Sequence, residues 1–164
     1  MAFKDAFLPE YDHEMGTTRR LLERVPEDRL DWQPHKKSMT LGRLATHMAE
    51  IPHWTQTIIK DSVFTMDGRP YEPKSITCRA DLLKLFDDTV AAARALIAPV
   101  SDAELMGTWT MRAGGHDVVS APKASLLRSF VMNHVIHHRG QLSVYLREND
   151  VPLPSIYGPT ADEP

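Results

Sequence analysis

The stretch 133–149 reads NHVIHHRGQLSVYLREN and carries the clearest helical pattern in the chain, together with three of its eight histidines. Counted with the residues just before the stretch, one face collects Leu127, Phe130, Val131, His134, His138, Gln141, Leu142 and Tyr145. Steps of three and four residues predict an amphipathic helix. Because His134 and His138 are four apart, they stand one above the other on the inward side. This face is therefore either an ordinary packed core or a metal site.

Three other segments have similar apolar stripes. The predicted helices run from Pro9 to Arg24, from Thr40 to Ser62, from Thr77 to Ala98 and, for the last one, from Ser120 to Glu148. A proline inside a helix removes a backbone hydrogen bond, so we expect Pro52 to kink the second helix just after His47. Ser120 is expected to cap the last helix, with Pro122 in its first turn.

Four amphipathic helices favour an all-α protein of the four-helix-bundle type. Before the last helix, Thr108–Arg112 and His116–Val119 alternate loosely around two glycines, which predicts a short β-hairpin excursion. The ending VPLPSIYGPTADEP is rich in proline and is expected to lack regular structure. A chain of 164 residues suits one domain that spans residues 1–164.

The composition is that of an ordinary globular protein, with 42% apolar and 25% charged residues. The net charge of −3 argues against a nucleic-acid binder. No apolar run approaches the roughly 20 residues that span a bilayer, and the first residues lack the apolar core of a signal peptide. The single cysteine, Cys78, excludes an internal disulfide. Together these features lead us to expect a cytoplasmic protein that does not bind membranes.

Helical geometry, at about 100° per residue, sorts the histidines by direction. His47 lies near the centre of the second helix's apolar face, and His134 and His138 bracket the centre of the last helix's face, whereas His13 and His53 point away. Each imidazole buried without a partner costs roughly 1–3 kcal/mol. Three of them would consume much of a typical stability of ~5–15 kcal/mol. A divalent metal removes this cost, because it accepts a lone pair from each neutral ring.

Three protein ligands with one open position are typical of catalytic zinc sites, whereas structural zinc sites are closed by four. The alternative of satisfied core histidines stays open. Other metal motifs fit less well. Val135 follows His134, so the zinc motif HExxH is absent. Glu10–His13 and Glu50–His53 match the Glu-x-x-His spacing of di-iron bundles, but their histidines point away and the last helix offers no inward carboxylate.

Four residues near the histidines are candidates for a supporting role, and none of them is assigned to catalysis. Gln141 and Tyr145 extend the histidine face and are candidates to hydrogen-bond a ligand, with simple core polarity as the alternative. Glu14, on the inward side of the first helix, is a candidate base or a support for a metal ligand. Gly140 costs the helix ~1 kcal/mol against alanine, so it either permits a close approach or is tolerated on the surface.

Three stretches carry a resemblance to a known family. LGRLATHMAEIPHW (41–54) looks like the second helix of the DinB/YfiT-like superfamily, NHVIHHRGQLSVYLREN is similar to its fourth-helix motif, and VPLPSIYGPTADE resembles its ending. The resemblance implies an up-down-down-up bundle, often dimeric. It also implies a divalent transition metal, typically zinc or nickel, held at the positions of His47, His134 and His138.

The resemblance also implies an activity. Characterised relatives include thiol S-transferases and a thiol-dependent isomerase that use low-molecular-weight thiols, while many members have no assigned substrate. We therefore expect a metal-dependent enzyme that activates such a thiol toward a small molecule. Two alternatives are a metal-dependent hydrolase with a metal-bound water and a non-catalytic metal or small-molecule binding module. A third alternative is a purely structural bundle whose histidines bind only an adventitious ion.

Overall fold

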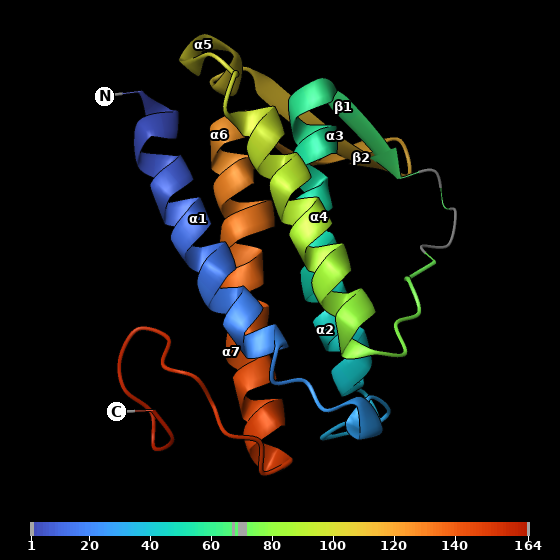
Figure 1. The fold of residues 1–164 in the computed structure, drawn as a ribbon. Coiled ribbons are helices and arrows are strands. Elements are labelled where there is room, and N and C mark those ends of the chain that lie inside the picture. Colours follow the sequence, from blue (N-terminus) through green and yellow to red (C-terminus); the bar gives the residue numbers. More distant parts are fainter. Residues whose placement is uncertain (1, 67, 69–71, 164) are drawn as a thin grey trace.

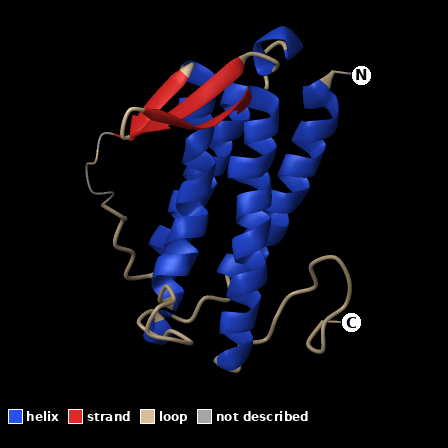
Figure 2. Ribbon diagram, turned by 180° about the vertical axis from the view of Figure 1, so that it is seen from behind, coloured by secondary structure: helices blue, strands red, loops and turns tan. Residues whose placement is uncertain are grey.

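The computed structural model of this protein describes residues 2–66, 68 and 72–163. Four long helical segments lie side by side, and a small sheet covers one end of them (Figure 1 and, from behind, Figure 2). Their main parts are α1 (Phe3–Leu22), α2 (Leu41–Glu50), α4 (Arg79–Ile97) and α7 (His134–Glu148). Helix α1 packs against α4 and α7, and α2 packs against the same two helices. The fold is therefore mostly helical, with one apolar core enclosed by the four segments.

The first helix begins at Phe3 and not at Pro9 as predicted. Pro9 lies inside α1, where it cannot donate the usual backbone hydrogen bond. The aromatic rings around it account for the longer helix. Phe7 and Tyr11 are fully buried, and the rings of Phe3 and Phe7 stack with centroids 5.0 Å apart. Burial of these large side chains offsets the missing hydrogen bond.

The expected distortion at Pro52 is confirmed. Helix α2 is followed by a 3₁₀ turn, η2 (Ile51–His53), and the chain then continues as α3 (Trp54–Lys60). At the other end of α2, the Thr40 hydroxyl accepts a hydrogen bond from the Arg43 backbone N–H at 3.2 Å, as a capping residue does. This segment carries His47 near the end of a rigid, capped helix.

The predicted hairpin is present as β2 (Thr108–Ala113) and β3 (His116–Pro122), which pair antiparallel. The sheet also has a third strand, β1 (Val63–Met66), which runs parallel to β2. The predicted hairpin is therefore confirmed, but it belongs to a three-stranded mixed sheet, so the fold is mostly helical and not all-α. Strand β1 is short and mostly exposed, so it has no alternating pattern that the sequence could reveal. Shorter helical pieces are η1 (Glu27–Arg29) and α5 (Asp102–Leu105).

The last helical segment begins later than predicted and is not uniform. Ser120 does not cap it, because β3 stays paired with β2 as far as Pro122. The helix starts as α6 (Lys123–Leu126), continues as π-helical turns, η3 (Leu127–Asn133), and becomes α7 at His134. A π-helix has hydrogen bonds between residues i and i+5 and is frequently found at functional sites. Here it ends directly at the first of the two α7 histidines that face α2.

The C-terminal segment, residues 151–163, has no helix or strand, in agreement with the prediction. It is nevertheless held against the helices. Arg147 pairs with Asp162, and Arg24 pairs with Glu163 at 2.7 Å. Among the described residues, none of the helices combines the length and apolar character needed to cross a membrane.

Candidate metal centre

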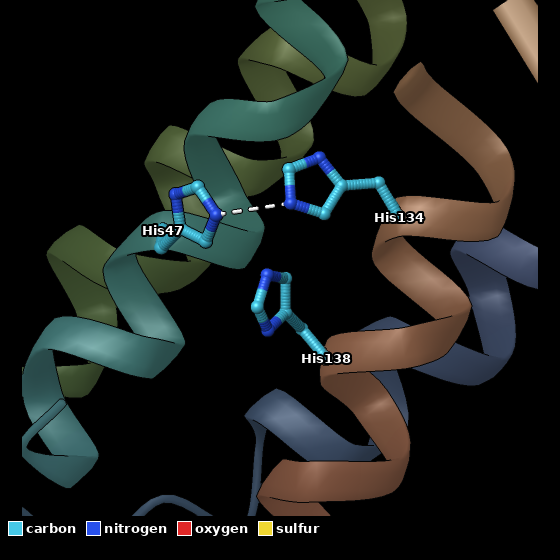
Figure 3. A group of neighbouring side chains, drawn as sticks. All are labelled: His47, His134 and His138. Carbon is cyan, nitrogen blue, oxygen red and sulfur yellow. Dashed lines mark hydrogen bonds between the residues drawn. The ribbon is translucent and has the colours of Figure 1, made fainter. Parts of the chain in front are cut away.

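Three histidines converge between α2 and α7. His47 projects from α2 toward His134 and His138, which project from successive turns of α7 (Figure 3). The three ring centroids form a nearly regular triangle, with separations of 5.0, 4.7 and 4.7 Å. One ring nitrogen from each residue lies within 4.8 Å of the other two. The structure thus brings together the three residues that the helical geometry had selected.

The spacing of the ring nitrogens suits a divalent transition metal. Nε2 of His47 lies 3.3 Å from Nε2 of His134. For Zn–N bonds of about 2.0–2.1 Å in a tetrahedral site, two nitrogen ligands lie roughly 3.3–3.4 Å apart. In the structure these two nitrogens share a hydrogen bond, in which one ring donates its N–H to the lone pair of the other. A metal ion held by the three rings would take the place of this hydrogen bond.

The two α7 histidines have their other ring nitrogen held by an oxygen. Nδ1 of His138 lies 2.6 Å from the side-chain oxygen of Gln141, and Nδ1 of His134 lies 3.4 Å from the backbone carbonyl of Phe130. Because amide and carbonyl oxygens only accept, each Nδ1 carries the proton and donates. Each Nε2 therefore presents a lone pair, which is the form that binds a metal. Such hydrogen bonds fix the tautomer and orientation of metal-binding histidines.

The surroundings keep these imidazoles neutral. Burial lowers the pKa of His47 to about 4, helped by His138, His134 and the cationic Arg43, while Glu50 opposes the shift. Burial also lowers the pKa values of His134 and His138. Neutral rings at physiological pH are ready to bind a cation without first losing protons.

The remaining histidines lie outside this cluster. His13 and His53 are exposed, which agrees with their predicted outward direction. His137 is also exposed on the flank of α7, with its ring 4.9 Å from that of His138. The burial pattern therefore separates the three converging rings from the others.

Two of the suggested supporting residues have partners elsewhere. Glu14 is 6% exposed, and its carboxylate lies 2.6 Å from the Arg139 guanidinium and accepts a hydrogen bond from the Tyr157 hydroxyl. Tyr145 packs edge-on against Trp32, with centroids 5.4 Å apart. The inward positions of both residues thus follow from packing and pairing. Gln141, by contrast, contacts the cluster directly through His138.

Sequence reasoning missed a charged pair beside His47. Arg43 stands one turn before His47 on α2, and Glu50 follows in the next turn. Their side chains form an ion pair at 3.1 Å. The spacing i, i+4 between Arg43 and His47 was the available signal that the two share a face. Glu50 also accepts a hydrogen bond from the backbone N–H of Lys74 at 3.0 Å, which fastens the loop before α4 to α2.

A pocket of about 540 Å³ adjoins the cluster, and His47 is part of its lining. Its other walls come from η2 and α3, from β1, from the loop before α4 and from α4 itself. The size lies within the range typical of small-molecule sites. The histidine cluster is therefore accessible to a small molecule from one side.

Comparison with known proteins places this architecture in a family. Residues 2–164 match the model of the DinB family. The chain belongs to the DinB family. Two similar proteins come from Bacillus subtilis strain 168. The uncharacterized protein YrdA is 28% identical over 164 residues, which cover 97% of this chain and 90% of YrdA. The uncharacterized protein YjoA is 29% identical over 137 residues, which cover 81% of this chain and 82% of YjoA.

Two crystal structures of DinB-like proteins share the fold. The Bacillus subtilis YjoA structure superposes with a TM-score of 0.70 at 22% identity and covers 90% of this chain and 95% of its own. A DinB-like protein from Bacillus cereus ATCC 10987 also gives a TM-score of 0.70, at 19% identity, with 93% and 97% coverage. These similarities establish the DinB-like helical fold. The three-histidine cluster is compatible with a metal ion.

Proposed function

We propose that His47, His134 and His138 bind a divalent transition metal, with zinc or nickel as the first candidates. One observation carries this proposal: the three rings converge, and in two of them an oxygen acceptor holds Nδ1, so that the lone pair of Nε2 faces the other rings. Imidazole nitrogen is a common donor for zinc, nickel, copper and iron alike, so the donor set does not select one metal. Three protein donors leave a coordination position for an external ligand.

We further propose that the protein uses this site to activate a low-molecular-weight thiol for transfer to an electrophile. A bound divalent cation would stabilise a thiolate and lower the pKa of the thiol. The protein's own residues then have two tasks. The histidines hold the site in one geometry through Gln141 and the Phe130 carbonyl, and the neighbouring pocket binds the second substrate.

The hydrolase alternative has less support, because it needs a general base near the site. The pocket that His47 lines includes the exposed Glu72 and, from α2 itself, the carboxylate of Glu50. Both of its oxygens are engaged, one by Arg43 and the other by the backbone of Lys74. Glu14 is held in its own buried ion pair. Thiol chemistry makes no such demand, since the thiolate is itself the nucleophile.

Two measurements test the proposal. Elemental analysis of protein purified without a histidine tag should find about one metal ion per chain, in the stoichiometry of a single site. The second measurement follows the conjugation of 1-chloro-2,4-dinitrobenzene with a panel of thiols, including bacillithiol and mycothiol. In this reaction sulfur forms a bond to the ring carbon, chloride leaves with its bonding electrons, and the thiol proton passes to solvent. Turnover by the wild type and not by His138→Ala supports the proposal that the protein is a metal-dependent thiol transferase.

Other outcomes separate the alternatives. Stoichiometric metal without turnover for any thiol would favour a binding module, whereas absence of metal would favour a structural cluster.

On the family resemblance we also propose that the four helical segments run up-down-down-up and that the chain forms a homodimer. Light scattering after size-exclusion chromatography should then give twice the mass of the chain.

A further inference from the structure

The pocket beside His47 has walls that favour one chemical class of ligand. We propose that it binds an uncharged aryl or alkyl group, so that the co-substrate of the site is a neutral, apolar electrophile. This inference rests on the proposed function for the role of the ligand, but its physical basis is the pocket alone.

One wall of the pocket is a rigid aromatic surface. The ring of Trp54 meets that of Phe64 edge-on at 5.3 Å and stacks on that of Phe130 at 6.1 Å. Phe64 in turn stacks on Trp109, which is fully buried and donates its ring N–H to the backbone carbonyl of Thr57 at 3.2 Å. These contacts fix Trp54 and Phe64 in place before any ligand arrives. A preformed aromatic wall suits a flat or apolar group.

Other lining residues add apolar surface to the pocket. Leu85 of α4 and Ile51 of η2 both contribute to the lining. An apolar group that moves from water into such surroundings gains free energy in proportion to the apolar area it buries. Most of the pocket therefore favours the burial of an apolar group and offers few hydrogen-bond partners to a polar ligand.

The charged residues of the pocket disfavour an anion. Its lining includes the acidic residues Glu50 and Glu72 and the basic residue Lys74. The Glu50 carboxylate is paired with Arg43, so this nearby guanidinium already has a counter-charge. His47 and His53 also belong to the lining. A carboxylate or sulfonate that enters here would lose its hydration next to two carboxylates and a single lysine.

The position of the pocket indicates what its ligand does in the reaction. His47 belongs both to the pocket lining and to the histidine cluster, so a group seated in the pocket lies next to the reacting centre. Low-molecular-weight thiols carry several polar groups, which this lining does not match. The pocket therefore positions the electrophile, and the thiol approaches from another side.

Two fluorescent probes that share one scaffold test this selectivity. N-phenyl-1-naphthylamine is neutral, and 8-anilinonaphthalene-1-sulfonate is the same molecule with one added sulfonate. Titration of the purified protein should show saturable binding of the neutral probe at one site per chain. We expect it to bind at least about tenfold more tightly than the sulfonate, because the pocket does not solvate a charge. Equal or tighter binding of the sulfonate would overturn the proposal.

Two variants locate the binding site. Phe64→Ala removes part of the aromatic wall and should lower the affinity for the neutral probe about tenfold or more. Leu85→Trp fills the pocket from the α4 side and should abolish binding. Phe3→Ala is the matched control, since Phe3 is also half-buried but lies near the start of α1 and is not part of the pocket lining. Thermal melts verify that each variant is folded. Wild-type affinity in both pocket variants would refute the assignment.

One further variant separates this inference from the proposed function. His138 belongs to the histidine cluster but not to the lining of the pocket. The His138→Ala protein should lose its metal and its turnover yet still bind the neutral probe. If the wild type instead shows metal and thiol turnover while the pocket variants bind the probe normally, the pocket assignment fails alone. If the probe results hold and metal is absent, only the proposed function fails.

Discussion

Nδ1 of His138 donates a hydrogen bond to the side-chain oxygen of Gln141, which lies 2.6 Å away and one turn further along α7. This contact turns the ring so that Nε2 faces His47 and His134. A residue that is itself exposed thereby orients a residue of the buried cluster. We therefore expect Gln141 to position His138, a role that is separable from any direct contact with a ligand.

Loss of the Gln141 acceptor should weaken metal binding. We expect Gln141→Leu to lower the metal affinity about 10–100-fold, because a histidine ligand without its acceptor loses its fixed tautomer and orientation. Competition with a chromogenic chelator measures the affinity. Gln141→Glu retains an acceptor oxygen and should keep most of the affinity. Gln56→Leu, an exposed glutamine on α3, is the control. Unchanged affinity in Gln141→Leu would rule out the positioning role.

The three converging histidines should behave differently from the exposed ones. His47→Ala, His134→Ala and His138→Ala should each lose stoichiometric metal, because the loss of one of three donors leaves only two. His53→Ala should keep full metal, since His53 is exposed. Elemental analysis of the four untagged variants tests this directly. Full retention in one of the first three would remove that residue from the ligand set.

The pH dependence follows from the lowered pKa of His47. In the metal-free protein this ring should titrate near pH 4, well below the usual 6.5, because burial disfavours the charged form. The unfolded chain takes up this proton at higher pH, so the contribution of His47 to stability is lost as pH falls from about 6.5 toward 4. Histidine ring resonances followed by NMR measure the midpoint. A midpoint at or above 6.5 would contradict a buried, neutral ring.

The Glu14–Arg139 pair should matter for stability and not for catalysis. Arg139 is 2% exposed, so Glu14→Gln leaves a buried cation without its counter-charge and should destabilise the protein by about 3–5 kcal/mol. Urea unfolding measures the loss. Glu10→Gln breaks an exposed pair with Arg128 and should cost no more than about 1 kcal/mol. Thiol turnover per metal-loaded Glu14→Gln molecule should be unchanged; its loss would restore Glu14 as a candidate base.

Gly140 offers a stabilising substitution. A Cβ atom at this position would meet no heavy atom within 4 Å, so no close approach requires glycine. Of the two readings of this residue, the structure supports the tolerated surface glycine. Gly140→Ala should therefore raise the free energy of unfolding by up to about 1 kcal/mol through helix propensity. A denaturation curve that shows a lower stability would reveal a contact absent from this structure.

Periodicity predicted most of the helical framework because it is a local property. The apolar stripes located the four long segments, and Pro52 marked the break after α2, since both signals depend only on neighbouring residues. The same geometry directed His47, His134 and His138 inward and His13 and His53 outward. The start of α1 was missed because long-range aromatic burial outweighed the local signal of Pro9.

The pocket and the details of the site depend on contacts between distant segments. Strand β1 has too few residues for a pattern, yet its pairing with β2 brings Phe64 against Trp54 and completes the aromatic wall. The register of Ser120 with Thr110 delays the last helix, and no local rule reveals the π-helical turns before His134. Local spacing thus indicated which side chains turn inward. Folding in three dimensions determined what they meet there, because hydrogen-bond partners and cavity walls come from parts of the chain that are far apart in sequence.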